Sequence, residues 1–386
     1  MIVLYKEPLR KFFIMLPAAI VAFIAFVDSS FGENEGMKRI VLFKSGKGGY
    51  DTYRIPAIVK TTKGTLLAFC EGRKNSSSDT GNIDLLLQRS LDNGFTWDET
   101  KVIVDDGNDT CGNPCPIVDQ KTGTLVLLLT KNKGHENEFQ IINGTASPRT
   151  VWLTRSTDDG VTWSTPSNIS SEVCKPDFRW YATGPCHGIQ LAGGRMVAPC
   201  DHSTGPAFDD MHSHVIFSDD GGMSWQIGGI LDSRTNECTA VQLADGSLYL
   251  NMRNYRNTNR RAVSVSSDNG MTWQSCRDDE ALLDPVCQAS VLRFSIEKDD
   301  GKNRVLFSNP ASKKRENMTV RLSYDECRTW PVSKSLWNGP SAYSDLVVTA
   351  DGKIGCLFEC GVTKPYETIT LALFSLEWLT GGADSP

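Results

Sequence analysis

The 386-residue sequence lacks several features that would place it in a broad class of protein. It has no long run of lysines or arginines and a formal net charge of −6, so a nucleic-acid partner is not expected. Its 40% hydrophobic and 22% charged residues exclude disordered, collagen-like and polytopic membrane proteins. Beyond the first 36 residues there is no long helical periodicity, so an all-helical fold is excluded as well.

The N-terminus has the order of a targeting segment. Lys6, Arg10 and Lys11 precede an apolar run over residues 12–27, and a polar stretch follows over 28–36. The run is shorter than the roughly 20 residues that a membrane-spanning helix needs. We predict that residues 1–36 are a signal peptide, with a retained membrane anchor as the alternative. The folded domain over 37–386 would then be exported: secreted, periplasmic or, in an animal, lysosomal.

The 12 cysteines are an even count, which in an exported chain usually indicates disulfides. Their contexts argue against pairing all of them, because Cys115 and Cys186 stand where any small residue would pack. Which cysteines pair stays open. The short spacings 111/115 and 356/360 lack a companion cluster of histidine or cysteine, so no metal and no cofactor are predicted.

An eight-residue motif recurs among short β-rich runs. It carries Ser, Asp, Gly, Thr or Ser, and Trp at its first, third, fifth, seventh and eighth positions. The copies begin at Ser90, Ser156, Ser218, Ser266 and Ser323. The fifth copy has Cys327 in place of glycine. A capping aspartate, a glycine at positive φ and a packing tryptophan are typical of a tight hairpin between two strands.

A second repeat consists of simpler hairpins with glycine at the tip. The tips are Gly64, Gly123, Gly194, Gly246, Gly301 and Gly352. Six hairpins, with five tryptophan turns out of phase with them, give six four-stranded antiparallel units of about 58 residues. Units of this kind arranged around an axis form a β-propeller, whereas a solenoid has shorter repeats without paired hairpins. We therefore predict an all-β, six-bladed β-propeller.

Strand direction then predicts which residues share one end of the propeller. The start of strand 1, the end of strand 2 and the loop from strand 2 to strand 3 lie at the same end, which we call the mouth. The tryptophan turns lie at the opposite end. Eight polar residues from four blades fall at the mouth: Arg54, Arg73, Asp79, Glu237, Arg253, Arg315, Tyr343 and Glu359.

This set of residue types suits a particular chemistry. Three guanidinium groups that point inward can clamp a carboxylate, because each offers paired planar donors. A tyrosine beside a glutamate can act as an activated phenol, and an aspartate on a loop can protonate a leaving group. A sugar with a carboxylate at its anomeric carbon would repel an anionic nucleophile, whereas a neutral phenol avoids that repulsion.

From about residue 40 to residue 380 the sequence resembles the exo-α-sialidases, or neuraminidases, which include secreted bacterial and lysosomal animal enzymes. The matching motifs are Tyr53-Arg-Ile-Pro, Glu71-Gly-Arg, Asn236-Glu, Ser308-Asn-Pro and Ser341-Ala-Tyr-Ser-Asp. Cys186 and Cys327 replace residues that are usually glycine in this family, which puts the local packing in question. For Arg315, the neighbouring Lys313, Lys314 and Arg321 are alternatives.

The resemblance implies a role for each mouth residue. Arg54, Arg253 and Arg315 would grip the carboxylate of sialic acid. Arg73 would contact the far side of the ring, and Glu359 would orient Arg54. Tyr343 would be the nucleophile, Glu237 its general base and Asp79 the acid/base.

Three further features have more than one interpretation. Trp180 and Tyr181 are candidates for the N-acyl pocket or the aglycone side. The histidines at 202, 212 and 214 are interpreted as part of a polar loop and strand rather than a metal site. Asn-x-Ser/Thr triplets begin at Asn75, Asn108, Asn143, Asn168 and Asn317.

The predicted function is hydrolysis of terminal α-linked sialic acids from glycoproteins, glycolipids and oligosaccharides, with retention through a tyrosyl-glycosyl intermediate. The alternatives are a trans-sialidase or intramolecular trans-sialidase, or a non-catalytic glycan-binding propeller. The linkage preference and the oligomeric state stay open.

Overall fold

The structure is a computed structural model that describes residue 3 and residues 36–386. The predicted leader lies outside the described residues except at its last position and residue 3, so it stays a prediction. The helices of the described part are short: α1 Glu138–Ile142, η1 Phe208–Asp210, α2 Ser170–Val173, α3 Glu297–Asp300 and α4 Leu376–Thr380. None of these helices is long and apolar enough to cross a membrane.

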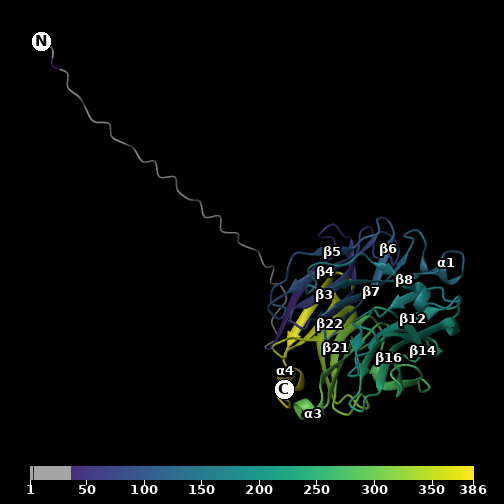
Figure 1. Ribbon diagram of the computed structural model, residues 1–386. Coiled ribbons are helices and arrows are strands. Elements are labelled where there is room, and N and C mark those ends of the chain that lie inside the picture. The colour runs from purple at the N-terminus through teal and green to yellow at the C-terminus, as the bar shows by residue number, and fades with distance from the viewer. Residues whose placement is uncertain (1–2, 4–35) are drawn as a thin grey trace. The chain divides into compact units, whose positions relative to one another are not determined.

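Six antiparallel blades follow one another around an axis, so the predicted six-bladed β-propeller is confirmed (Figure 1). Blade 1 contains β2 Thr52–Lys60, β3 Leu66–Arg73, β4 Ile83–Ser90 and β5 Lys101–Val104. Blade 2 contains β6 Thr110–Val118, β7 Leu125–Asn132, β8 Thr150–Ser156 and β9 Ser167–Asn168. Blade 3 contains β10 Tyr181–Thr183, β11 Ile189–Gln190, β12 Met196–Ser203, β13 Met211–Ser218 and β14 Gln226–Ser233.

The second half of the chain forms the other three blades. Blade 4 contains β15 Thr235–Gln242, β16 Leu248–Asn254, β17 Arg260–Ser266 and β18 Arg277–Leu283. Blade 5 contains β19 Ser290–Ser295, β20 Arg304–Pro310, β21 Glu316–Ser323 and the first half of β22 Val332–Val348. Blade 6 contains the second half of β22, β23 Ile354–Cys360, β24 Thr368–Phe374 and β1 Met37–Lys44.

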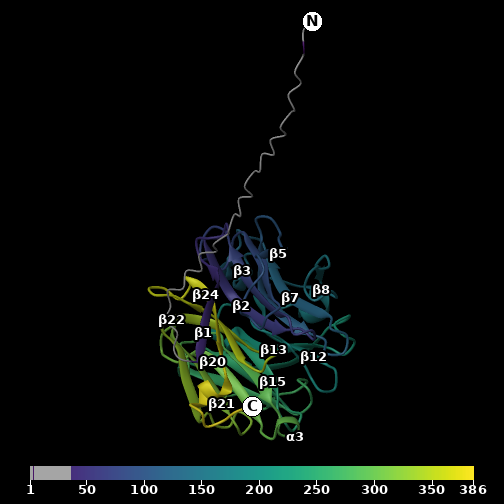
Figure 2. The ribbon, with the colours of Figure 1, turned by 90° about the vertical axis from the view of Figure 1, so that its left-hand side faces the viewer.

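The ring of blades closes through a pairing that the repeats did not reveal. Strand β1 supplies the outer strand of blade 6, antiparallel to β24, with Met37 opposite Phe374. Figure 2 shows this purple strand beside the yellow end of the chain. The first and last described segments of the propeller therefore belong to the same sheet.

Both faces of most strands are buried because each blade packs between two others. Each of the six largest apolar clusters draws its residues from two neighbouring blades; one, for example, joins Leu67 and Phe69 of β3 to Leu125 and Leu127 of β7. Buried faces on both sides explain why strands such as β3 read as continuous apolar runs rather than as alternating ones.

The tryptophan turns have the predicted hairpin chemistry. In the first copy Ser90 accepts from the Gly94 N–H at 2.9 Å, while the Asp92 carboxylate accepts from the Thr96 N–H at 2.8 Å. Cys327 replaces the glycine of the fifth copy without loss of this bond, because its N–H donates to Ser323 at 3.0 Å. Cys186 is buried with a φ of 149°, a backbone region that favours glycine.

All 12 cysteines lie in the described part of the chain, and all are free thiols. Ten of them are buried, and eight of these act as small apolar residues in the clusters between blades. The stability of this propeller therefore rests on packing rather than on cross-links.

A buried carboxylate at the axis joins the inner strands of several blades. Asp345 of β22 accepts from the Ile58 N–H of β2 at 2.8 Å and from the Ser290 hydroxyl of β19 at 2.8 Å. It also accepts from the His187 N–H at 3.1 Å, and its other oxygen lies 2.7 Å from His187 Nδ1. Blades 1, 3, 5 and 6 thus meet on a single side chain.

Blade 3 contains a buried pair of neutral histidines. Nδ1 of His202 lies 3.0 Å from Nδ1 of His214, whose Nε2 lies 2.8 Å from the Tyr181 hydroxyl. Burial, with nearby His212 and Lys175, lowers the pKa of His202 to about 3, and burial also lowers the pKa of His214. If both rings were protonated, each Nδ1 would carry a hydrogen, and two N–H donors would face each other without an acceptor between them.

The folded protein should therefore become less stable in acid because of this pair. In the unfolded chain a histidine takes up a proton near pH 6.5. The contribution of the neutral pair to the free energy of unfolding is therefore fully present above about pH 6.5 and is lost as the pH falls toward 3. Melting temperatures from about pH 7.5 to about pH 4.5 should fall less steeply for His202→Asn than for the wild type. The control His135→Asn, at an exposed position, should keep the wild-type slope. Equal slopes for all three proteins would contradict this account.

Candidate active site

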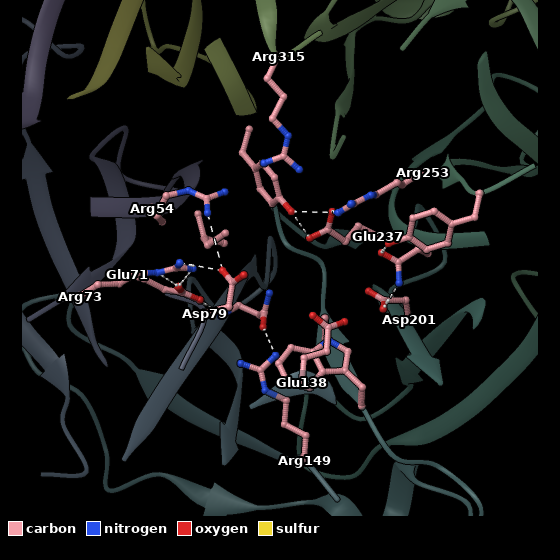
Figure 3. Close-up of a pocket in the computed structure, with 17 residues that line it drawn as sticks. Arg54, Glu71, Arg73, Asp79, Glu138, Arg149, Asp201, Glu237, Arg253 and Arg315 are labelled. Carbon is pink, nitrogen blue, oxygen red and sulfur yellow. Dashed lines mark hydrogen bonds and ion pairs between the residues drawn. The ribbon is translucent and has the colours of Figure 1, made fainter. Parts of the chain in front are cut away.

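The structure brings seven of the eight predicted mouth residues into the lining of one pocket (Figure 3). They come from the start of β2, the end of β3, the loops after β3 and β20, and strands β15, β16 and β22: Arg54, Arg73, Asp79, Arg315, Glu237, Arg253 and Tyr343. Glu359 of β23 is fully buried and contacts Arg54 and Tyr343. The direction rule therefore places these residues correctly.

Tyr343, Glu237 and Arg253 form the centre of the pocket. The Tyr343 hydroxyl donates to Glu237 Oε1 at 2.6 Å, and Arg253 Nη1 donates to Glu237 Oε2 at 2.8 Å and to the Tyr343 oxygen at 3.3 Å. Burial and the Glu237 carboxylate raise the pKa of Tyr343 well above its ordinary value. The phenol is therefore neutral, with a carboxylate in place to accept its proton.

Figure 3 shows Arg54, Arg253 and Arg315 on one side of the pocket. All three lie close to the Tyr343 side chain. The guanidinium carbon of Arg54 lies 5.0 Å from the ring centroid, and that of Arg315 lies 5.5 Å from it. Tyr366 is a residue that the sequence did not single out. Its hydroxyl oxygen accepts from Arg315 Nη1 at 2.6 Å, and its ring centroid lies 4.0 Å from the guanidinium carbon of Arg54. Three cations around one phenol make a site for an anion with planar oxygens.

Glu359 links the first blade to the last behind these arginines. One of its oxygens accepts from Arg54 Nε at 2.7 Å and from the Ile55 N–H at 2.9 Å. The other accepts from the Tyr343 N–H at 3.1 Å. Burial opposes the charge on Arg54, but Glu359, Tyr366, Tyr343 and Asp79 together outweigh it, so the pKa of Arg54 is raised well above its ordinary value.

Asp79 lies on the loop between β3 and β4, close to both Arg73 and Arg54. Its Oδ1 lies 2.7 Å from Arg73 Nη1 and 3.7 Å from Arg54 Nη1, and its side chain is 61% exposed. Partial burial raises its pKa, but Arg73 and Arg54 outweigh this and hold the pKa of Asp79 below its ordinary value. Glu71 fixes Arg73 with two hydrogen bonds, at 2.6 and 3.0 Å.

The wall that faces the three arginines contains residues that the sequence reasoning missed. Arg149 is buried there, and its Nη1 donates to Asn113 Oδ1 at 2.6 Å while its guanidinium stacks on Trp180 at 4.1 Å. Trp180 lines the pocket, whereas Tyr181 is fully buried against His214 and does not line it.

Two missed carboxyl groups also line the pocket. Partial burial and the Asp79 charge raise the pKa of Glu138. Burial and Glu237 raise the pKa of Asp201, whose Oδ2 accepts from Asn236 at 2.7 Å. Glu138 and Arg149 lie between β7 and β8, and Asp201 lies near the end of β12, so the direction rule places all three at the mouth, in blades 2 and 3.

The arrangement can do three things chemically. It can hold a carboxylate on three guanidinium groups, deliver a buried phenol to an adjacent carbon and protonate a group that leaves past Asp79. Within residues 36–386 no group of three His, Cys, Asp or Glu side chains is arranged to hold a metal ion.

Comparisons with known proteins agree on one family. Residues 64–356 match the family model described as a BNR repeat-like domain. The chain is 32% identical over 371 residues to an exo-alpha-sialidase of Aspergillus fumigatus, covering 87% of each protein. It is 33% identical over 356 residues to a sialidase of Micromonospora viridifaciens, covering 87% of this chain and 53% of that one. Among solved structures, the Hadza microbial sialidase Hz136 aligns with a TM-score of 0.78 at 30% identity, covering 88% of this chain and 69% of that one.

Replacement of Glu359 should test its role as the link between blades. Glu359→Ala leaves Arg54 buried without its partner, which should cost about 3–5 kcal/mol of unfolding free energy. Glu359→Gln keeps an acceptor for the N–H groups and should cost less. The matched control Glu280→Ala removes an ion pair whose glutamate is 85% exposed, and it should change stability by less than about 1 kcal/mol. Urea unfolding measures all three, and a Glu359→Ala protein as stable as the control would refute the link.

Proposed function

Because this chain belongs to the sialidase family of BNR-repeat proteins, we propose that it is an exo-α-sialidase acting by a retaining mechanism. Its substrates would be glycoproteins, glycolipids and oligosaccharides with a terminal α-linked sialic acid. The observation that carries the proposal is the Tyr343–Glu237 hydrogen bond of 2.6 Å beside three arginines. A glycan-binding propeller without catalysis would have no need of a phenol bonded to a base at the centre of its pocket.

The arginines Arg54, Arg253 and Arg315 would hold the carboxylate of the sugar. This carboxylate is attached to the anomeric carbon, so binding it brings that carbon next to the Tyr343 ring. Because C5 lies across the pyranose ring from the anomeric C2, the C5 substituent would face the wall that contains Arg149 and Trp180.

In the first chemical step the Tyr343 oxygen would attack the anomeric carbon. Its proton would pass to Glu237, and the bond to the leaving oxygen would break as Asp79 donates a proton to that oxygen. The product of this step is a tyrosyl-glycosyl intermediate and a free aglycone. A neutral phenol suits this step, because a carboxylate nucleophile would be repelled by the carboxylate of the sugar.

In the second step a water molecule would attack the same carbon. Asp79 would take one proton from the water, and Tyr343 would leave and recover its proton from Glu237. Two inversions give overall retention. Transfer to an acceptor sugar, or to a hydroxyl of the same sugar, would use the same residues and would give a new glycoside or an anhydro sugar in place of the free sugar.

We also propose that the protein acts after export, because the order of basic, apolar and polar residues at its N-terminus is that of an export signal or anchor. Cell-surface and secreted glycoconjugates are the sialylated molecules that such an enzyme would meet.

The first prediction from this mechanism concerns the phenol. Tyr343→Phe removes only the nucleophilic oxygen and should lower kcat/KM on a fluorogenic sialoside by about a hundredfold or more. Circular dichroism should be unchanged. The control Tyr249→Phe removes a buried phenol in blade 4 and should keep full activity. Near-wild-type turnover by Tyr343→Phe would remove Tyr343 from the mechanism, and an initial β-anomer product by NMR would exclude retention.

The second prediction concerns Asp79. Asp79→Asn should lower kcat/KM by about 10²–10⁴-fold for sialyllactose, whose leaving group needs a proton, and much less for a nitrophenyl sialoside, whose leaving group does not. A substrate carboxylate bound to Arg54 offsets the charge that holds the Asp79 pKa low. The pKa of the acid seen in kcat should therefore be higher than that seen in kcat/KM. Equal losses on both substrates would show that Asp79 is not the acid.

A further inference from the structure

The nucleophile of the proposed mechanism stands in an irregular part of its strand. Strand β22 pairs with β23 in a register that places Ser341 opposite Cys360 and Ser344 opposite Phe358. Two residues of β22 therefore lie opposite a single residue of β23, and Tyr343 is the second residue of this β-bulge. Because a bulge interrupts the ladder of hydrogen bonds, strand pairing alone does not fix the position of the tyrosine.

Buried side chains supply the hydrogen bonds that the ladder lacks here. Glu359, the residue opposite the bulge, accepts from the Tyr343 N–H at 3.1 Å. The next residue, Ser344, is held by Gln288: its N–H donates to Gln288 Oε1 at 2.9 Å, and its carbonyl accepts from Gln288 Nε2 at 2.9 Å. Two residues of paired strands exchange hydrogen bonds in the same way. The side-chain amide of Gln288 thus takes the place of a strand partner for Ser344.

Gln288 is fixed by a third hydrogen bond. Its side chain is 1% exposed, and Nε2 also donates to the Pro185 carbonyl at 2.8 Å. The amide oxygen and both N–H groups of Nε2 are therefore in use. Gln288 stands just before β19 in blade 5, so its amide joins this blade to blade 3 and to the strand of the nucleophile in blade 6.

The segment that ends at this glutamine is strained and firmly held. Val286 has a φ of 59°, a conformation that a β-branched residue rarely adopts and that persists only where its surroundings impose it. The next residue, Cys287, donates its N–H to Asp284 Oδ2 at 3.0 Å, and its carbonyl accepts from the fully buried Arg261. These contacts set the position from which the glutamine side chain reaches β22.

The same segment packs against the bulge. Cys287 is fully buried and belongs to a small apolar cluster with Ile55, Ala342 and Tyr343. Consecutive residues of one segment therefore meet the nucleophile strand in two ways, the cysteine by apolar packing and the glutamine by hydrogen bonds.

A neutral amide has an advantage at this position. The Tyr343 side chain already lies beside the charges of Glu237, Arg253 and Arg315. A further buried charge close to this strand would change the pKa of the phenol and of its base. An amide can bind an N–H and a carbonyl of the same residue without adding charge.

We propose that Gln288 is a positioning residue for the nucleophile. Its amide holds the Ser344 backbone and so keeps the Tyr343 hydroxyl on Glu237 and directed at the anomeric carbon. The proposal rests on the proposed sialidase function, because Tyr343 must be the attacking group. Gln288 is not among the residues that line the pocket in the described chain, so it acts through Tyr343 and not on the sugar.

Attack by the nucleophile and binding of the sugar can be measured separately. Gln288→Met keeps the length of the side chain and removes its hydrogen bonds. On a fluorogenic sialoside kcat should fall about tenfold to a hundredfold, because a small displacement of a reacting group is costly. KM should change by less than about threefold, because the arginines that bind the carboxylate are untouched. The rate at which 2,3-difluorosialosyl fluoride forms an adduct on Tyr343, followed by mass spectrometry, should fall by the same factor as kcat.

A matched control separates positioning from loss of a buried amide in general. Gln88 is a buried glutamine of β4 whose Nε2 donates to the Leu42 carbonyl at 3.1 Å and to Thr100 at 2.8 Å, outside the pocket. Gln88→Met should keep the wild-type kcat, KM and adduct rate.

A second variant of the same residue gives a readout in pH. Gln288→Glu keeps the shape of the side chain, but its ionised form cannot donate to the Ser344 carbonyl and adds a buried charge. Its protonated form is neutral and can donate again. The ratio of its kcat to the wild-type kcat should therefore rise about tenfold from pH 7.5 to pH 5.5, whereas the ratio for Gln288→Met should stay level.

The outcomes distinguish this proposal from the function on which it rests. Folded wild-type protein that neither turns over the sialoside nor forms the adduct would refute the sialidase function itself. An active wild type with an unchanged kcat and adduct rate in Gln288→Met would leave that function standing and refute the positioning role. A rise in KM as large as the fall in kcat, or an equal loss of kcat in Gln88→Met, would refute it as well. Should Gln288→Met fail to fold, a kcat ratio for Gln288→Glu that does not change with pH would refute it instead.

Discussion

The carboxylate of Glu359 is the contact on which the active site depends. It binds the Arg54 side chain and the Ile55 N–H from the first blade and the Tyr343 N–H from the last. These two blades also share an apolar cluster, and β1 completes the last blade by pairing with β24. Two residues beyond Tyr343, Asp345 binds inner strands of blades 1 and 5. Closure of the propeller and assembly of the pocket are therefore one structural event.

Five arginines and five acidic residues line the pocket, and three of the arginines are each fixed by one partner. Glu359 holds Arg54, Glu71 holds Arg73, and Tyr366 holds Arg315. These contacts orient the guanidinium groups before any ligand arrives, so little reorganisation is needed when an anion binds. The same burial that makes the contacts strong raises the pKa of Tyr343 and keeps its phenol protonated beside Glu237.

The fold was predictable because its signals are local. Each tryptophan turn is specified within eight residues by serine, aspartate and glycine, and the strand directions follow from counting hairpins. The pairing of β1 with β24 was not predictable, because it joins segments more than 320 residues apart and no hairpin marks it. The mouth residues of blades 1, 4, 5 and 6 were found by direction and family motif together. Arg149 and Asp201 of blades 2 and 3 obey the same direction rule, but an isolated polar residue at a strand end has no feature that separates it from solvated surface.

The acid in such a site has to meet a requirement that the other residues do not. Glu359 and Glu71 stand on strands with fixed partners, whereas an acid/base must exchange a proton with each product and each water. Asp79 is on a loop, its side chain is 61% exposed, and its ion pairs are with Arg54 and Arg73. In the proposed mechanism a bound carboxylate offsets the charge of Arg54, so substrate binding itself raises the affinity of Asp79 for a proton.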